Sequence, residues 1–141
     1  MISLSFPDVN VWLALATPEH VHGAAARLWW SKETGSIAFS LITQLGFLRL
    51  MTTAAAMDGK PLTMLAAWRV YERFFDDDRI AFFPESAEAQ RYFREDTEVP
   101  HASPKLWVDS WLLALSRAAG GKVVTFDKAL AARGALCLLT P

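Results

Sequence analysis

Short runs of apolar residues alternate along the chain with longer segments in which apolar residues recur every three or four positions. The short runs are typical of buried parallel strands, and the longer segments are typical of amphipathic helices. The strands predicted in this way cover residues 2–6, 36–40, 79–83, 122–126 and 135–139. The predicted helices cover residues 9–16, 21–32, 41–56, 62–75, 87–95, 104–119 and 127–133. This alternation predicts an α/β fold with a mainly parallel sheet.

Residues that favour helix ends support several of these boundaries. Ser40 is a favourable N-cap, and Pro61 and Pro104 suit positions at or just before a first helical turn. Gly120 followed by Gly121 is typical of the end of a helix. The chain has 141 residues, the length of one ordinary domain, and we therefore predict a single domain over residues 1–141.

Composition narrows the class of protein. Hydrophobic residues make up 52% of the chain and charged residues 21%, so a substantial core can form. The net charge of −1 argues against a basic protein that coats nucleic acid, but permits a local positive groove. Cys137 is the single cysteine, which excludes an internal disulfide and favours a reducing compartment. Without a signal peptide or an apolar run of about 18 residues, the chain is expected to be soluble and cytoplasmic.

Three aspartates are expected to meet at one edge of the predicted sheet. Asp8 and Asp127 each follow a predicted strand, and Asp109 lies near the start of a predicted helix. In a parallel sheet, strands end and the following helices begin at the same edge, where ligands bind. Carboxylates gathered there would repel one another unless a cation were present, and their hard oxygen atoms suit Mg²⁺ or Mn²⁺. The pattern therefore predicts a metal-dependent hydrolytic site.

Structural roles are the alternative for each aspartate. An aspartate that follows a strand is a favourable N-cap for the next helix, and this could be the whole role of Asp8 and of Asp127. Asp109 is harder to explain in this way, because apolar residues surround it in its predicted helix. A carboxylate in such a segment needs a partner.

With these aspartates, four segments of the chain resemble the PIN-domain ribonucleases, and among them the VapC toxins of bacterial toxin-antitoxin pairs. The segments cover residues 6–13, 43–50, 106–115 and 124–127, and they occur in the order expected along nearly the whole chain. The resemblance implies a three-layer α/β/α fold with five strands in the order 3-2-1-4-5. It also implies that Asp8 is the central metal ligand, Asp109 the second, and Asp127 a further ligand, direct or through water.

One position departs from the commoner pattern of the family. Many PIN domains have a glutamate where this chain has Gln44. Its amide oxygen can still accept a bond from a coordinated water, but the side chain carries no charge and cannot act as a base. Whether one or two metal ions bind is therefore open. The alternative to a role for Gln44 in the site is that it is only a polar residue in the first turn of its helix.

Several other polar residues are weaker candidates. Asn10 and Thr125 could orient Asp8, a water or a phosphate, or they could be ordinary turn and cap residues. Arg49 could reach the substrate backbone or an acidic partner. A basic rim is expected from Lys105, Lys122, Lys128 and Arg133. Two groups are interpreted as solvated and non-catalytic, the run 76–78 of three aspartates and the residues His20, His22 and His101.

The six tryptophans suggest a partner surface as well as a core. Trp107 and Trp111 are expected to face the core, whereas Trp12 and one residue of the pair Trp29 and Trp30 are expected at an interface. The resemblance implies a homodimer and a cognate VapB-like antitoxin, whose amphipathic helix would dock against these helices.

The leading hypothesis is thus a Mg²⁺- or Mn²⁺-dependent endoribonuclease toxin that hydrolyses RNA and is inhibited by its antitoxin. A non-catalytic PIN-like module that binds RNA or protein is an alternative, suggested by Gln44. A small phosphatase of the haloacid-dehalogenase type is a further alternative, with Asp8 as nucleophile and Ser40 and Lys122 as phosphate ligands. That class needs a second aspartate two residues after the nucleophile, where this chain has Asn10.

Overall fold

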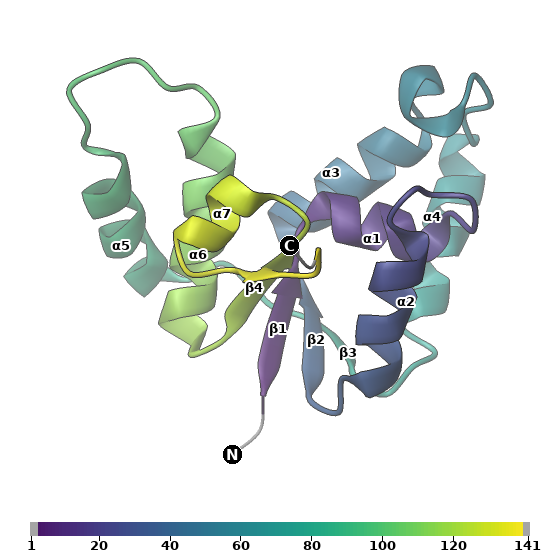
Figure 1. Cartoon of the computed structure of the whole chain (residues 1–141), viewed down its shortest axis with the longest axis horizontal. Helices are drawn as coiled ribbons and strands as arrows, with labels where there is room; N and C mark the ends of the chain where they lie inside the picture. Colours follow the sequence, from purple (N-terminus) through teal and green to yellow (C-terminus); the bar gives the residue numbers. More distant parts are fainter. Residues whose placement is uncertain (1–2, 140–141) are drawn as a thin grey trace.

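The strands of the protein form one parallel sheet in a computed structural model that describes residues 3–139. The spatial order is β3-β2-β1-β4-β5, as the resemblance implied (Figure 1). The strands are β1 (Leu4–Pro7), β2 (Ser36–Phe39), β3 (Ile80–Phe82), β4 (Lys122–Thr125) and β5 (Leu136–Cys137). All of the predicted strands are confirmed, four of them with shorter bounds, whereas β1 ends one residue later than predicted, at Pro7. Ile2 of the first prediction lies outside the described residues.

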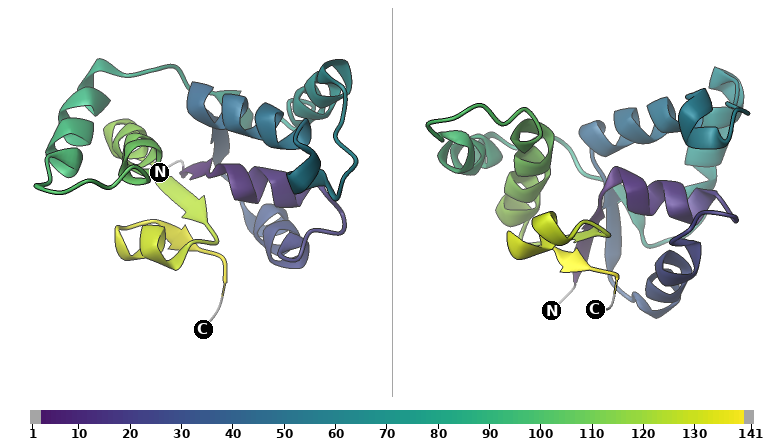
Figure 2. Two further views of the ribbon diagram at one scale, coloured as in Figure 1. Left: turned by 90° about the horizontal axis from the view of Figure 1, so that it is seen from above. Right: turned by 45° about the horizontal axis from the view of Figure 1, so that its top comes forward.

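Helices cover both faces of this sheet. They are α1 (Val9–Ala16), α2 (Gly23–Lys32), α3 (Leu41–Met51), the 3-10 turn η1 (Ala54–Met57), α4 (Met64–Phe74), α5 (Ala87–Thr97), α6 (Leu106–Ala119) and α7 (Lys128–Ala132). Helices α5 and α6 lie together on one side of the sheet, and α1, α2 and α4 lie on the other (Figure 2). This is the three-layer α/β/α arrangement that was expected.

Alternation along β2 explains why the sheet can be covered on both faces. Ile37 and Phe39 belong to a buried cluster with residues of α1, α3 and α4, whereas Ala38 belongs to a cluster with residues of α5 and α6. Successive side chains of a strand point to opposite faces, so a run of apolar residues supplies both cores.

Two of the tryptophan predictions are wrong. Trp12, predicted at an interface, is fully buried and stacks on Phe39 with 3.7 Å between the ring centroids. Trp107, predicted in the core, is 56% exposed. Trp111 does pack against the buried cluster beneath α6. Helical spacing alone could not separate the two, because Trp107 lies in the first turn of α6, beyond the part that the sheet covers.

The long helix predicted over residues 41–56 is interrupted. It begins as predicted, because the Ser40 hydroxyl accepts the Thr43 N–H and the Thr43 hydroxyl accepts the Ser40 N–H, forming a capping box. It ends at Met51, where the hydroxyls of Thr52 and Thr53 donate to carbonyls of the last turn at 2.9 and 2.6 Å. These bonds compete with further helical hydrogen bonds, so the chain turns into η1.

Strands β1 and β4 are neighbours, and this pairing positions the site. Phe6 is paired with Val123 and Pro7 with Val124, and the Asp8 N–H donates to the Val124 carbonyl at 2.9 Å. The two strands therefore end side by side at the point where the strand order reverses, which is where open α/β sheets bind ligands. Within residues 3–139, none of the helices has the length and apolar character needed to span a membrane.

Candidate active site

Asp8 occupies the turn between β1 and α1. Its backbone is extended, with φ −73° and ψ 173°, and its Oδ1 accepts the Val11 N–H at 3.1 Å, so it caps α1. Its other oxygen, Oδ2, accepts a short 2.5 Å hydrogen bond from the Thr125 hydroxyl. The capping interpretation of Asp8 is therefore correct for one oxygen only, and the second oxygen faces the end of β4.

Thr125 connects Asp8 to the turn that carries Asp127. The side chain is fully buried, and its Oγ1 accepts the Asp127 N–H at 2.9 Å while donating its own proton to Asp8. A hydroxyl has one proton to donate, and with the Asp127 N–H occupying an acceptor position that proton is directed to the carboxylate. Thr125 thus holds Asp8 in one orientation.

Asp127 caps α7. Its Oδ1 accepts the N–H groups of Ala129 and Leu130 at 2.8 and 3.3 Å. The side chain is exposed, and no hydrogen bond involves its Oδ2 within the described part of the chain. One carboxylate oxygen of Asp127 thus caps the helix, as at Asp8, but the other oxygen of Asp127 remains available at the edge of the sheet.

Asp109 lies in the first turn of α6 and is half-buried. Burial raises the pKa of this carboxyl and the charge of Asp127 raises it further, whereas the nearby charges of Arg133 and Lys105 act in the opposite direction. Arg133 is anchored there, because its Nη2 donates to the hydroxyl of the buried Ser110 at 2.7 Å.

The three aspartates act on one another electrostatically. Burial raises the pKa of Asp8, the hydrogen bonds from Thr125 and the Val11 N–H oppose this shift, and the charges of Asp109 and Asp127 add to it. The three carboxylates that the sequence singled out therefore lie near enough for their charges to interact. The charged forms of Asp8 and Asp109 are disfavoured at this edge.

The donor chemistry of this edge fits a hard divalent cation. Between residues 3 and 139, no three Asp, Glu, His or Cys side chains are close enough to enclose a metal ion by themselves. Mg²⁺ is usually held by only one or two carboxylates and keeps several waters, so it does not require such a cage. The carboxylate oxygens at this edge suit this mode of binding, because a cation would offset the repulsion between their charges.

Gln44 lies in the first turn of α3, and its Nε2 donates to the hydroxyl of Tyr71 on α4 at 3.2 Å. Its bond therefore goes to Tyr71 and not to a carboxylate. Helix α3 is held close to α1 at Gly46, where a Cβ atom would lie 2.6 Å from Cγ2 of Val9. The sequence analysis missed Tyr71, because it lies 27 positions from Gln44 within a segment that reads as an ordinary amphipathic helix.

Only some of the weaker candidate residues lie near the acidic edge. Asn10 is exposed in the first turn of α1, two residues from Asp8. Arg49 is exposed in the last turn of α3, about 7.5 Å along the axis from Gln44, and is thus not brought to the acidic edge. Lys105 and Arg133 lie close enough to affect Asp109, as the predicted basic rim requires. Lys122 is wrong as a rim residue, because it begins β4 at the opposite edge of the sheet.

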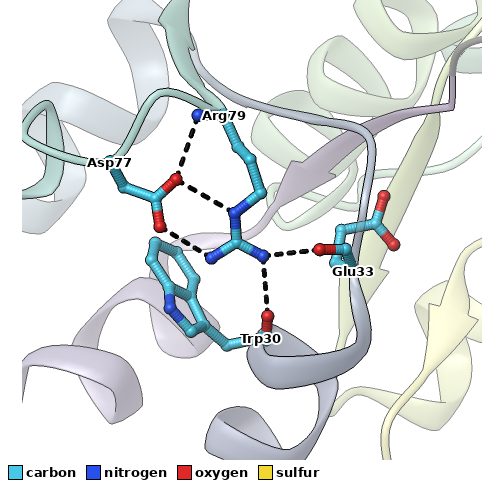
Figure 3. Close-up of polar contacts among 4 residues, drawn as sticks. All are labelled: Trp30, Glu33, Asp77 and Arg79. Carbon is cyan, nitrogen blue, oxygen red and sulfur yellow. Dashed lines mark hydrogen bonds and ion pairs between the residues drawn. The ribbon is translucent and has the colours of Figure 1, made fainter.

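The acidic run at residues 76–78 is not part of the site. It follows α4 at the opposite edge of the sheet, where Asp77 forms a two-point ion pair with Arg79 at 2.8 and 3.0 Å (Figure 3). Arg79 also donates to the carbonyls of Trp30 and Glu33 at the end of α2, and its guanidinium lies 4.5 Å from the Trp30 ring centroid. Asp77 is therefore a structural residue, and more than the solvated helix end expected from the sequence.

Comparison with known proteins agrees with this fold. The family model of the PIN domain matches residues 5–136. The chain therefore belongs to the PIN-domain family, and the alternative of a haloacid-dehalogenase phosphatase loses its support.

Named relatives show to which group of PIN-domain proteins the chain is similar. The chain is 38% identical to Ribonuclease VapC41 of Mycobacterium tuberculosis, over 92% of each chain. It is 30% identical to Ribonuclease VapC39 of the same organism, over 88% of each chain. It is also 34% identical to Ribonuclease VapC44, over 88% of this chain and 86% of the relative. These relatives place it among the VapC ribonucleases.

Solved structures share the fold. VapC20 of Mycobacterium tuberculosis, a toxin that cleaves the sarcin-ricin loop, matches with a TM-score of 0.65 over 97% of this chain and 99% of its own, at 15% identity. VapBC2 of Rickettsia felis, solved bound to a DNA fragment of its promoter, matches with a TM-score of 0.55 over 95% and 96% of the two chains, at 13% identity. At these identities the likeness concerns the fold alone.

Proposed function

We propose that this protein is a metal-dependent endoribonuclease toxin that hydrolyses RNA phosphodiester bonds, with Asp8, Asp109 and Asp127 as its essential carboxylates. The observation that carries the proposal is the position of Asp8, which is fixed by Thr125 at the junction of β1 and β4 and is electrostatically coupled to the other two aspartates. The names of the VapC relatives, which are ribonucleases, support the same activity.

Different residues at this edge would bind the metal ion, orient its ligands and position water. Bound Mg²⁺ or Mn²⁺ would activate water and stabilise the charge that develops on a phosphodiester. Asp8 and Asp109 would supply ligands, and Asp127 would bind through its free oxygen, directly or through water. Thr125 would keep Asp8 ionised and oriented. Gln44, whose nitrogen is held by Tyr71, would leave its amide oxygen to accept a bond from water.

Cleavage of RNA by the purified protein tests this proposal. We expect cleavage with Mg²⁺ or Mn²⁺, none with a chelator, and a loss of at least a hundredfold in Asp8→Asn, because that variant loses the central charge with little change of shape. The matched control is Asp78→Asn, an exposed aspartate at the opposite edge of the sheet. Undiminished cleavage by Asp8→Asn would remove Asp8 from the site.

A non-catalytic RNA- or protein-binding module remains the second candidate, because Gln44 lacks charge and is engaged by Tyr71. Calorimetric titration with Mn²⁺ distinguishes the two. The catalytic proposal requires Mn²⁺ binding that weakens in Asp8→Asn and in Asp109→Asn. A protein that binds RNA without binding Mn²⁺ would be a module of the second kind.

We further propose a cytoplasmic toxin neutralised by a VapB-like antitoxin. The partnership is supported by the toxin-antitoxin pair in the Rickettsia felis structure. A hollow of about 310 Å³ adjoins α1 and α2, the helices for which the sequence suggested a partner. Its lining is partly apolar and partly charged, and comprises Ala16, Trp30, Val70, Phe74, Arg73 and Asp77. Co-expression with the product of a neighbouring small reading frame should suppress RNA cleavage and yield a complex on gel filtration.

A homodimer is the expected assembly of the free protein. Exposed apolar side chains on α3 and α4 support it, with Leu45 57%, Met64 72% and Leu65 62% exposed. Large apolar side chains exposed on a surface favour association. Light scattering at several concentrations should give twice the mass of the 15.7 kDa chain, and a single-chain mass throughout would exclude the dimer.

A further inference from the structure

A basic groove lies on the side of the sheet closed by β5 and extends to the start of β4. It has a volume of about 470 Å³, and its lining includes Arg117 of α6, Lys122 at the start of β4 and Arg133 after α7. Strand β5 has only two residues, which pair with Val124 and Thr125. The first half of β4 therefore lacks a strand on that side among residues 3–139, and the groove occupies this space.

Positive charge in the groove is not neutralised. Three cationic side chains line it against one carboxylate, that of Asp96. Across residues 3–139 the ion pairs are Asp77 with Arg79 and Arg94 with Glu98, so none of the three cations forms one. The whole chain carries a net charge of −1. The groove thus concentrates cations on a molecule that is otherwise slightly acidic, which favours an anionic ligand.

Two of these cations are already oriented. The guanidinium of Arg117 lies 4.0 Å from the ring centroid of Tyr92, and that of Arg133 donates to the buried Ser110 hydroxyl at 2.7 Å. A guanidinium has five N–H donors, and Arg133 uses one of them in the hydrogen bonds of the described chain. Arginine held in this way can offer its remaining donors to a phosphate with little further loss of entropy.

Arg133 links the groove to the candidate active site. Arg133 bonds to Ser110, the neighbour of Asp109, and also lines the groove. Arg117 lies eight residues after Asp109 in α6, which is about 12 Å along the helix axis at 1.5 Å per residue. In Figure 1, α6, β4 and α7 run next to one another on this side of the molecule. A strand that leaves the carboxylates past Arg133 would meet Arg117 and Lys122 next.

We infer that this groove binds the phosphodiester backbone of the RNA strand that extends from the acidic edge, with Arg133 at its entrance and Arg117 and Lys122 at its far end. The inference rests on the proposed ribonuclease function. Backbone contacts carry no base information, so the groove contributes affinity and direction, and recognition of sequence lies elsewhere. The alternative occupant, an acidic protein segment, is an outcome of the test.

RNA binding without cleavage isolates this contribution. The background is Asp8→Asn, and the probe is a fluorescent single-stranded RNA whose affinity is measured by anisotropy over a range of salt concentrations. We expect Arg117→Gln with Lys122→Gln to weaken binding about tenfold near 50 mM salt. Loss of two phosphate contacts should reduce the slope of log K against log salt by about 1.4. The control is Arg27→Gln with Lys60→Gln, an equal loss of exposed charge elsewhere.

The outcomes separate this inference from the proposed function. Unchanged affinity and salt slope in the Arg117 and Lys122 variant, with an unchanged thermal midpoint, would overturn the inference even if the wild-type protein cleaves RNA. Groove-dependent binding by a protein that fails to cleave would leave the inference standing and remove the proposed function. If a poly-glutamate peptide binds through these residues while RNA affinity is unchanged, the groove is a site for acidic protein. Single variants at Arg117 and Lys122 serve if the double variant does not fold.

Discussion

The Thr125 hydroxyl donates its proton to Oδ2 of Asp8 at 2.5 Å, joining residues 117 positions apart in the chain. Oγ1 of Thr125 also accepts the backbone N–H of Asp127. One buried hydroxyl therefore connects two of the three candidate carboxylates.

Thr125→Val should remove this connection with almost no change of shape. The valine cannot donate to Asp8 or accept from Asp127, and a buried hydrogen bond to a charged group stabilises a protein by about 1.5–3 kcal/mol. We expect a loss of this order in the free energy of urea unfolding, together with a fall in kcat/KM for RNA cleavage. Thr125→Ser keeps the hydroxyl and should retain most of both. Equal stability of the valine and serine variants would contradict the role given to this bond.

Asp109→Asn should stabilise the metal-free protein. The raised pKa of Asp109 means that the folded state disfavours the charged form, so wild-type stability should rise as pH falls from neutral through that pKa towards the unfolded value of about 3.9. The neutral amide avoids this cost, and because solvent screens the charge of this half-exposed side chain we expect a gain of no more than about 1 kcal/mol. Urea unfolding with a chelator at pH 7 measures the gain. Asp78→Asn, an exposed control, should show none.

Divalent metal should make the wild-type protein more stable than Asp109→Asn, the reverse of the order expected without metal. A ligand present at about 100 times its Kd stabilises the folded protein by about 2.7 kcal/mol. Addition of Mn²⁺ should therefore raise the Tm of the wild-type protein and leave Asp8→Asn and Asp109→Asn nearly unchanged. Equal shifts in all three proteins would mean that the metal binds elsewhere.

The Asp77 and Arg79 pair should contribute stability that depends on pH. Hydrogen bonds from the Arg79 side chain and N–H lower the pKa of Asp77 below its ordinary value. A carboxyl with a lowered folded-state pKa stabilises the protein above the unfolded pKa of about 3.9, and this contribution is lost as pH falls through the folded value. We expect Asp77→Asn to cost up to about 1 kcal/mol at pH 7 and nothing once the wild-type carboxyl is protonated. A cost that is independent of pH would point to packing instead.

The close approach of α3 to α1 at Gly46 gives a test by double substitution. A Cβ atom at Gly46 would meet Val9 at 2.6 Å, and overpacking of this kind costs about 1–3 kcal/mol. In a Val9→Ala background the clash disappears, and the higher helix propensity of alanine should then make Gly46→Ala stabilising by up to about 1 kcal/mol. Additive effects of the two substitutions would show that the contact is not tight.

The positions of the three aspartates could be predicted because they depend on strand order and direction alone. Asp8 and Asp127 follow neighbouring parallel strands, and Asp109 begins a helix at the same edge. The partners of the site residues could not be predicted, because a sequence does not indicate which way a side chain turns. The bond from Gln44 to Tyr71 depends on how α3 packs against α4, and the burial of Trp12 depends on its stacking against Phe39.

The groove illustrates a further limit of the sequence. Residues 135–139 predict a strand of ordinary length, but only Leu136 and Cys137 pair with β4. The cause is the turn after α7, where Gly134 takes a left-handed φ of 106° and the chain joins β4 only near its end. Lys122 lies away from the acidic edge because it begins β4, and it lines the groove because the late pairing of β5 leaves the space beside it open.

The cap that Asp127 forms at α7 affects how any substitution at this position must be interpreted. Helix α7 has only five residues and is followed by Arg133, so an Asp127→Ala protein would lose an acidic oxygen and also loosen the segment that places a cation beside Asp109. Loss of activity in Asp127→Ala would therefore not show which of these two changes caused it. Asp127→Ser distinguishes them, because serine still caps a helix but offers no carboxylate.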